Sequence, residues 1–273
     1  MAEPAFASRN LAGHETALRT WPGDADRPAL AISCMLGSAG LWTGVADQLQ
    51  GRVALTGFDL PGHGRSADWQ PTPDGPDYAT LSTRIAAELI DRPIDLIGHS
   101  FGATIALRIA VAAPEAIRTL TLIEPVLFAA VRDTPGNAEN ARWAEALGAL
   151  FKAGDIRGAT RMFTTTWGTD FDALPVPAQE AMIRRMPLVQ YSNKSLYEDT
   201  GRILRKDGLE AIDAPVMLIA GAESPAVIHD IADALAARLP DVGRATVPGA
   251  AHMLPATHPV QVAGLIGANL DRA

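Results

Sequence analysis

The fold is decided by one short stretch near the middle of the chain, Leu96-Ile97-Gly98-His99-Ser100-Phe101-Gly102. An apolar run typical of a buried strand, Pro93–Ile97, leads into it, and apolar residues at helical spacing, Ile105 and Ile109, follow it. Glycines on both sides of the serine allow a tight turn from strand to helix, since larger side chains there would collide with neighbouring backbone. The pattern G-x-S-x-G between a strand and a helix predicts a nucleophile elbow with Ser100 as the nucleophile.

Outward from this stretch, short apolar runs alternate with helical patterns. The runs that predict strands are Pro28–Cys34, Val53–Phe58, Pro93–Ile97, Leu120–Ile123, Pro215–Ala220 and Arg244–Val247. The helical patterns lie near residues 41–50, 78–91, 101–113, 226–238 and 258–270. Such alternation is typical of a parallel sheet with helices on both faces. The sequence therefore predicts an α/β fold with a mostly parallel central sheet, to which residues 14–21 are expected to add antiparallel edge strands.

The alternation stops between residues 126 and 205, where apolar side chains such as Trp143 and Leu147 recur at helical spacing. We expect this segment to be a helical insertion, and residues 1–125 and 206–273 to form the core domain. The insertion is expected to be broken by prolines, at positions 175, 177 and 187. It forms either a helical cover that completes the core or a cap over a pocket at the carboxyl edge of the sheet.

The large side chains of the insertion bear on the kind of substrate. We expect most of them to serve packing and a minority to line an apolar pocket; they are Trp143, Phe151, Met162, Phe163, Trp167, Phe171, Met182 and Met186. Adjacent arginines, Arg184 and Arg185, are typical of a solvated surface, although they would also suit an anionic substrate group.

Composition narrows the class of protein. The chain has 273 residues and a net charge of −8, which disfavours nucleic acid as a partner because binding to phosphates needs a concentrated basic face. A single cysteine, Cys34, excludes an intrachain disulfide and a cysteine-based zinc cluster. No dinucleotide, P-loop or H-E-x-x-H motif occurs, so neither a cofactor nor a metal is expected. We also expect no membrane span and, without a secretory leader pattern, a cytoplasmic location.

Four landmarks together resemble the α/β-hydrolase fold family over nearly the whole chain. The elbow is the first, and the insertion at residues 126–205 falls where the family's cap usually lies. The turn Phe58-Asp59-Leu60-Pro61-Gly62-His63-Gly64-Arg65-Ser66 is similar to the family's turn after the strand that precedes the elbow strand. The stretch Pro248-Gly249-Ala250-Ala251-His252-Met253 resembles the segment that carries the catalytic histidine. The resemblance implies a serine hydrolase with a helical cap.

The serine hydroxyl needs a base within hydrogen-bonding reach, and the base needs a third group that holds it in one tautomer. The resemblance assigns the base to His252, which follows the last strand in the family's order of serine, acid and histidine. Two other histidines, His63 and His99, lie in turns similar to family turns whose histidines are structural.

The acid is where the sequence departs from the common family pattern. Many relatives carry an aspartate three residues after the glycine that ends the penultimate strand, and Ser224 stands at that position here. Some branches, haloalkane dehalogenases among them, carry the acid just after the strand that follows the elbow helix. Glu124 stands there and is the expected acid, with Glu223 and Asp230 as alternatives, beside a site with no acid at all.

Acyl transfer also needs backbone donors for the oxyanion of the tetrahedral intermediate. One expected donor is the N–H of Phe101, directly after the nucleophile. The resemblance assigns the other to the N–H of Met35, although Ser33-Cys34 replaces the family's usual His-Gly pair there. Cys34 as the nucleophile is a rival interpretation, but nothing around it resembles a cysteine–histidine site.

The expected function is hydrolysis of a small to medium carboxylic ester or thioester, a small-molecule substrate, through an acyl-enzyme intermediate. Carbon–carbon bond hydrolysis, perhydrolysis and amide cleavage are alternatives on the same fold, since fold does not fix function. A ligand-binding protein with little or no turnover is an alternative from another class. Dehalogenation is disfavoured because Ser100 stands where that chemistry needs an aspartate. The sequence does not distinguish a monomer from a homodimer.

Overall fold

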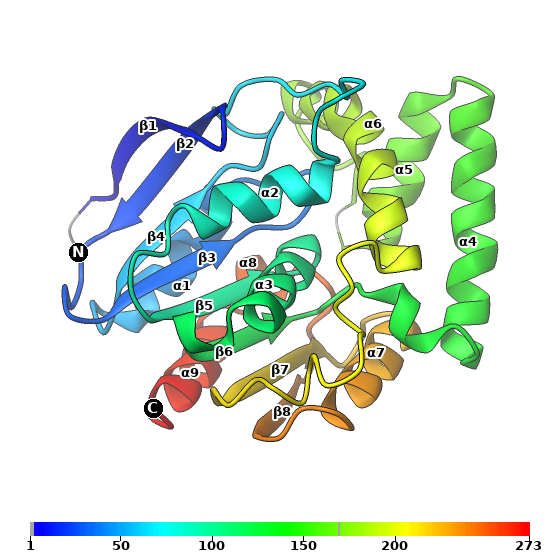
Figure 1. The fold of residues 1–273 in the computed structure, drawn as a ribbon. Helices are drawn as coiled ribbons and strands as arrows, with labels where there is room; N and C mark the ends of the chain where they lie inside the picture. The colour runs from blue at the N-terminus through cyan, green and yellow to red at the C-terminus, as the bar shows by residue number, and fades with distance from the viewer. Residues whose placement is uncertain (1–2, 169) are drawn as a thin grey trace.

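A computed structural model describes residues 3–168 and 170–273 as a single twisted sheet covered by helices (Figure 1). Within those residues the sheet has the strand order β1-β2-β4-β3-β5-β6-β7-β8. The strands are β1 (Ala5–Leu11), β2 (His14–Trp21), β3 (Pro28–Ile32), β4 (Ala54–Phe58), β5 (Ile94–His99), β6 (Ile117–Ile123), β7 (Val216–Gly221) and β8 (Val242–Val247). From β3 to β8 all pairings are parallel, whereas β2 pairs antiparallel with both β1 and β4. The predicted α/β class with a mostly parallel sheet is confirmed.

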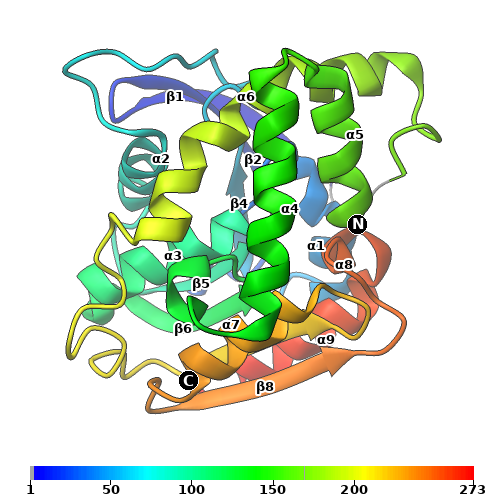
Figure 2. The same cartoon turned by 90° about the vertical axis from the view of Figure 1, so that its right-hand side faces the viewer.

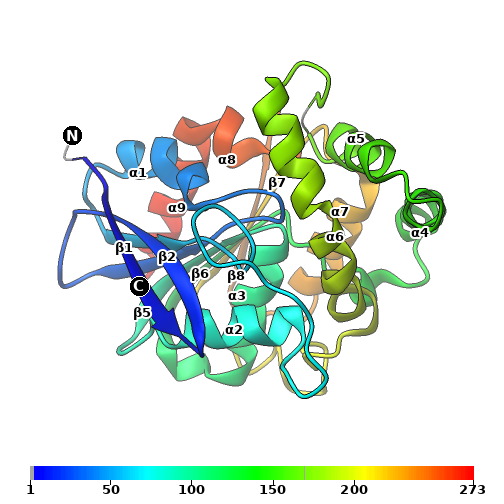
Figure 3. The ribbon, with the colours of Figure 1, turned by 90° about the horizontal axis from the view of Figure 1, so that it is seen from above.

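Helices cover both faces of the sheet, as the view from above shows (Figure 3). Helices α1 (Thr43–Leu49) and α9 (Pro259–Leu270) pack on one face, where Val45 and Ile266 are fully buried. The opposite face carries α2 (Tyr78–Ala87), α3 (Phe101–Ala112) and α7 (Ala226–Ala236). Because β5 is buried along its whole length between these layers, the turn at its carboxyl end has a rigid base.

The amino-terminal edge of the sheet differs from the expectation. Residues 14–21 form β2 as expected, but the outermost strand is β1, which the sequence did not predict. All residues of β1 except Leu11 are exposed, so no alternation of apolar and polar residues marks it as a strand. Its pairing with β2, from Ala5 opposite Thr20 to Leu11 opposite His14, holds it in place.

Residues 126–205 form helices that stand together at one end of the sheet (Figures 1 and 2). They are a short 3-10 turn, η3 (Phe128–Val131), and the helices α4 (Pro135–Lys152), α5 (Ile156–Thr166) and α6 (Val176–Glu198). The expected break at Pro187 is wrong, because α6 continues through it. Buried neighbours on both sides, Met186 and Leu188, supply tertiary packing that offsets the lost backbone hydrogen bond. In the part of the chain that the structure describes, no helix is long and apolar enough to cross a membrane.

Candidate active site

Ser100 lies in the turn between β5 and α3, where its backbone takes the unusual angles φ 58° and ψ −120°. Both flanking glycines are required by close backbone contacts. A Cβ on Gly98 would lie 2.4 Å from the carbonyl oxygen of Gly102, and one on Gly102 would lie 2.2 Å from that of Ile32. The turn therefore has the tight geometry that the G-x-S-x-G pattern predicts, with the serine at the amino end of α3.

Three side chains from different strand ends meet in an unbroken chain of hydrogen bonds. The hydroxyl of Ser100 lies 2.9 Å from Nε2 of His252, and Nδ1 of His252 lies 2.9 Å from Oε2 of Glu124. Ser100 follows β5, Glu124 follows β6, and His252 lies in the loop after β8. All three residues are buried, and the Glu124 side chain has no exposed surface. The structure thus brings together the residues expected as nucleophile, base and acid.

The second carboxylate oxygen of Glu124 is also fully used. Oε1 accepts hydrogen bonds from the backbone N–H of Gly221, at 2.6 Å, and from the hydroxyl of Ser224, at 2.9 Å. Both donors come from the end of β7, which pairs with β6. Ser224 stands at the position where the common family pattern has the acid, and here its hydroxyl holds the carboxylate of Glu124, the candidate acid. A buried anion that accepts three hydrogen bonds is well compensated for lost hydration.

The alternative acids lie elsewhere. Glu223 is exposed, and Asp230 is half-buried on α7. Within residues 3–168 and 170–273, neither carboxylate forms a hydrogen bond with His252. The geometry therefore favours Glu124 over both alternatives.

His63 and His99, the two histidines in glycine-containing turns, are buried, and their side chains are not part of the hydrogen-bonded set Ser100, His252 and Glu124. His99 lies with Nε2 2.8 Å from the backbone oxygen of His252, so it holds the loop that carries the candidate base. Burial lowers the pKa of His99 to about 3, which keeps its ring neutral. His63 lies with Nδ1 3.0 Å from the backbone oxygen of Pro61, and burial lowers its pKa to about 4.

His63 also supports the loop of the candidate oxyanion donor, a role that sequence reasoning missed. Its Nε2 accepts a 2.9 Å hydrogen bond from the N–H of Leu36, directly after Met35. Leu36 takes the left-handed φ of 62°, which turns the chain sharply at this point. Among the hydrogen bonds of the described residues, none uses the N–H of Met35. Met35 and Phe101 both line the cavity at Ser100, as two oxyanion donors would have to.

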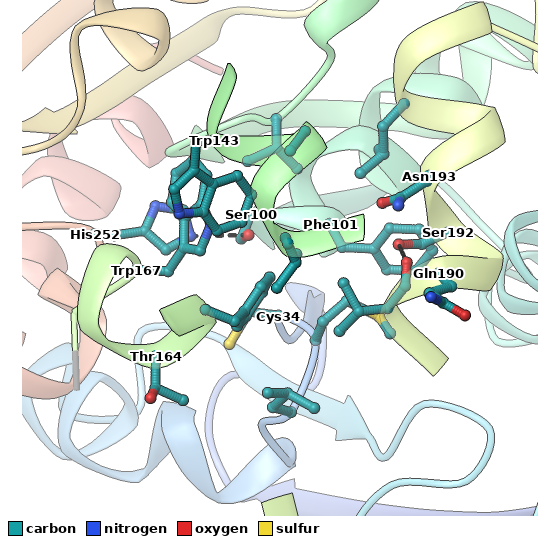
Figure 4. Close-up of a pocket in the computed structure, with 18 of the residues that line it drawn as sticks. Cys34, Ser100, Phe101, Trp143, Thr164, Trp167, Gln190, Ser192, Asn193 and His252 are labelled. Atoms are coloured by element: carbon teal, nitrogen blue, oxygen red, sulfur yellow. Dashed lines mark hydrogen bonds between the residues drawn. The ribbon is translucent and has the colours of Figure 1, made fainter. Parts of the chain in front are cut away.

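A cavity of about 210 Å³ opens at Ser100 and lies under the helices of residues 126–205. Five of the eight large side chains considered above line it, namely Trp143, Phe151, Phe163, Trp167 and Met182. The expectation that only a minority would do so is wrong, because α4 and α5 turn their aromatic faces toward the cavity. Trp167 covers the candidate base directly, since its ring meets that of His252 edge-on at 4.8 Å between centroids (Figure 4).

Neither Arg184 nor Arg185 lines this cavity. Arg184 is exposed and Arg185 is half-buried, so the expected alternative of an anion clamp at the substrate is not supported. Burial raises the pKa of the Cys34 thiol to about 12, so this cavity residue is a neutral thiol and a poor nucleophile. No group of three or more histidine, cysteine or carboxylate side chains able to hold a metal ion gathers in the described ranges.

Comparison with known proteins identifies the family. The sequence model of the alpha/beta hydrolase family matches residues 29–265, so the chain belongs to this family. Its class is therefore that of a hydrolase, and its relatives include esterases. The chain is 28% identical over 247 residues to a pimeloyl-acyl-carrier-protein methyl ester esterase of Methylococcus capsulatus, with 83% of this chain and 88% of the relative covered. An esterase of the same name from Yersinia pseudotuberculosis is 27% identical over 240 residues, covering 84% and 87%.

Solved structures show the same fold. The haloalkane dehalogenase DatA from Agrobacterium tumefaciens superposes with a TM-score of 0.76 at 20% sequence identity, with 98% of this chain and 97% of that chain covered. At this level of identity the likeness concerns the fold alone.

Proposed function

We propose that this chain is a serine hydrolase that cleaves small to medium carboxylic esters or thioesters through an acyl-enzyme intermediate. The observation that carries the proposal is the hydrogen-bonded chain from Ser100 through His252 to Glu124, which ends at an apolar cavity. The similarity to methyl ester esterases supports an ester as the substrate.

In the first half of the reaction, Oγ of Ser100 bonds to the carbonyl carbon of the substrate while its proton passes to Nε2 of His252. The carbonyl oxygen takes up the electron pair of the broken π bond and accepts hydrogen bonds from the N–H groups of Met35 and Phe101. Glu124 faces the Nδ1–H of His252 and stabilises the imidazolium that forms. The carbonyl then re-forms, and the alcohol or thiol leaves with the proton from His252.

In the second half, a water molecule gives its proton to Nε2 of His252 and attacks the acyl carbon on Ser100. The tetrahedral intermediate uses the same two backbone donors. It collapses when Oγ of Ser100 leaves and takes the proton back, which releases the carboxylic acid. Both halves use one base in one tautomer, and the hydrogen bond from Nδ1 of His252 to Glu124 fixes that tautomer.

The test is a series of p-nitrophenyl esters of increasing acyl length, measured together with labelling by a fluorophosphonate. We expect a burst of p-nitrophenol equivalent to the enzyme, and loss of both hydrolysis and labelling in Ser100→Ala. A matched control is Ser195→Ala, a serine on α6 whose hydroxyl donates to the backbone oxygen of Ser192. Full labelling of Ser100→Ala, or stoichiometric ligand binding by the wild type without product, would overturn the proposal.

A further inference from the structure

The cavity at Ser100 has no ionised wall. None of the residues that line it is a lysine, an arginine, an aspartate or a glutamate. Its titratable side chains are Cys34, Tyr197 and His252, and burial raises the pKa values of the thiol and the phenol, so both are neutral near pH 7. A charged group of a substrate would lose its hydration inside this cavity without gaining a partner.

The polar side chains that line the cavity differ in whether they already form hydrogen bonds within the protein. The hydroxyls of Thr164 and Ser192 donate to carbonyl oxygens of their own helices, at 2.9 Å to Thr160 and 2.8 Å to Val189. Among the side-chain hydrogen bonds of the described part of α6, none involves the carboxamide of Gln190 or that of Asn193. The hydroxyl of Tyr197, also on α6, already accepts a 3.0 Å hydrogen bond from Nδ2 of Asn140. Among the described residues, Gln190 and Asn193 are therefore the wall side chains of α6 whose donors and acceptors are both unused.

Gln190 and Asn193 are placed to act together. They lie three residues apart on α6, which puts them on the same side of the helix. Both are exposed and line the cavity, so they mark a side on which it meets solvent. In Figure 4 they lie on α6 across the cavity from Ser100 and His252, with Phe101 and Cys34 between. A substrate whose carbonyl is at Ser100 reaches them only past this apolar stretch.

We infer that the substrate is a neutral ester or thioester whose acyl chain is apolar next to the reacting carbonyl and ends in an amide-like group. Gln190 and Asn193 are the specificity-determining residues that bind this end. A carboxamide side chain offers both an N–H donor and a C=O acceptor, which is the pattern an amide complements. A terminal carboxylate is bound less well than an amide, because it gains no cation there and must pass the uncharged wall of the cavity. This inference rests on the proposed function, since it takes Ser100 as the reacting group.

The experiment compares three p-nitrophenyl esters of one acyl chain length that end in methyl, carboxamide or carboxylate. We expect wild-type kcat/KM for the carboxamide ester to exceed that for the carboxylate ester about 10-fold. In the double variant Gln190→Leu, Asn193→Leu, the ratio of kcat/KM for carboxamide over methyl should fall about 10-fold. The control Lys194→Leu adds a leucine at an exposed position of α6 that does not line the cavity, and should keep the wild-type ratio.

The ratio of kcat/KM for the carboxamide ester over the methyl ester, measured within one variant, distinguishes loss of the binding groups from misfolding. A misfolded double variant lowers both activities together, whereas loss of the binding groups changes their ratio. If the double variant keeps the wild-type ratio, or if the carboxylate ester is the best of the three, the inference is wrong. If none of the three esters is hydrolysed, or if Ser100→Ala hydrolyses them as well as the wild type does, the proposed function itself fails.

Discussion

Replacing Glu124 by glutamine tests the hydrogen-bond pattern of the site most sharply. Three donors converge on the two oxygens of this side chain, and glutamine keeps only one oxygen. The Gly221 N–H is fixed in the backbone and can only donate, so the amide oxygen of glutamine must remain there. The amide NH₂ group then faces Nδ1 of His252, which has to become an acceptor. This places the imidazole proton on Nε2, where it faces Ser100 and blocks proton transfer from the hydroxyl.

The expected effect of Glu124→Gln is therefore loss of the correct tautomer, with the fold retained. A wrong tautomer in a serine–histidine–carboxylate site costs about 10⁴-fold in kcat, which is roughly 5 kcal/mol of transition-state stabilisation. KM should change little, because the cavity wall is untouched. The assay is steady-state hydrolysis of the best p-nitrophenyl ester at pH 7, with burst kinetics to follow acylation.

Glu223→Gln is the matched control, since Glu223 is exposed and has the same side chain just after β7, the strand that pairs with β6. It should retain kcat within about 2-fold, as expected for a surface substitution. A kcat of Glu124→Gln within 10-fold of wild type, or a larger loss in Glu223→Gln, would refute this reasoning and move the acid to the end of β7.

Three further predictions concern single hydrogen bonds, ion pairs and buried histidines of the structure. Ser224→Ala removes one hydrogen bond to Glu124 and should lower kcat about 3-fold to 10-fold, with KM retained. Asp95→Ala leaves two half-buried arginines without their buried carboxylate and should lower the free energy of unfolding in urea by about 3 kcal/mol. His63 and His99 stay neutral in the folded protein but take up protons in the unfolded chain below about pH 6.5, so the free energy of unfolding falls with acid. Urea unfolding should show that this free energy is about 4 kcal/mol lower at pH 5 than at pH 7. In His63→Gln, about half of this decrease should be absent.

The parts of the fold predicted from the sequence are those in which local chemistry leaves few alternatives. The elbow is an example, because Gly98 and Gly102 each face backbone at distances that no Cβ tolerates. The strand β1 escaped prediction for the opposite reason, since its exposed residues carry no periodic signal and its pairing with β2 holds it. Helical spacing identified the segment at residues 126–205, but spacing does not tell which helix face meets a cavity and which meets the core.

The candidate site shows the same division. Glu124 was expected from the resemblance to family branches that carry the acid after the strand following the elbow helix. Its contact with Ser224 depends on the pairing of β6 with β7, which brings together residues 100 positions apart. Pro187 was expected to end a helix, but buried neighbours override a local preference that is strong only in isolation. Contacts of this kind depend on the three-dimensional arrangement and leave no pattern in a single sequence.

The hydrogen bond from the N–H of Leu36 to His63 bears on which amino-acid substitutions this protein tolerates. A backbone donor stabilises a developing negative charge only if its direction is fixed before the charge appears. For the proposed donor at Met35, a ring that lies 27 residues away in sequence helps to fix this direction, because it accepts a hydrogen bond from the next N–H along the chain. Side chains at positions 34 and 35 are thereby released from that duty, whereas position 63 is not. Among descendants of this protein, substitutions at position 63 should be eliminated, whereas those at positions 34 and 35 should be limited only by how the buried side chain fits the cavity.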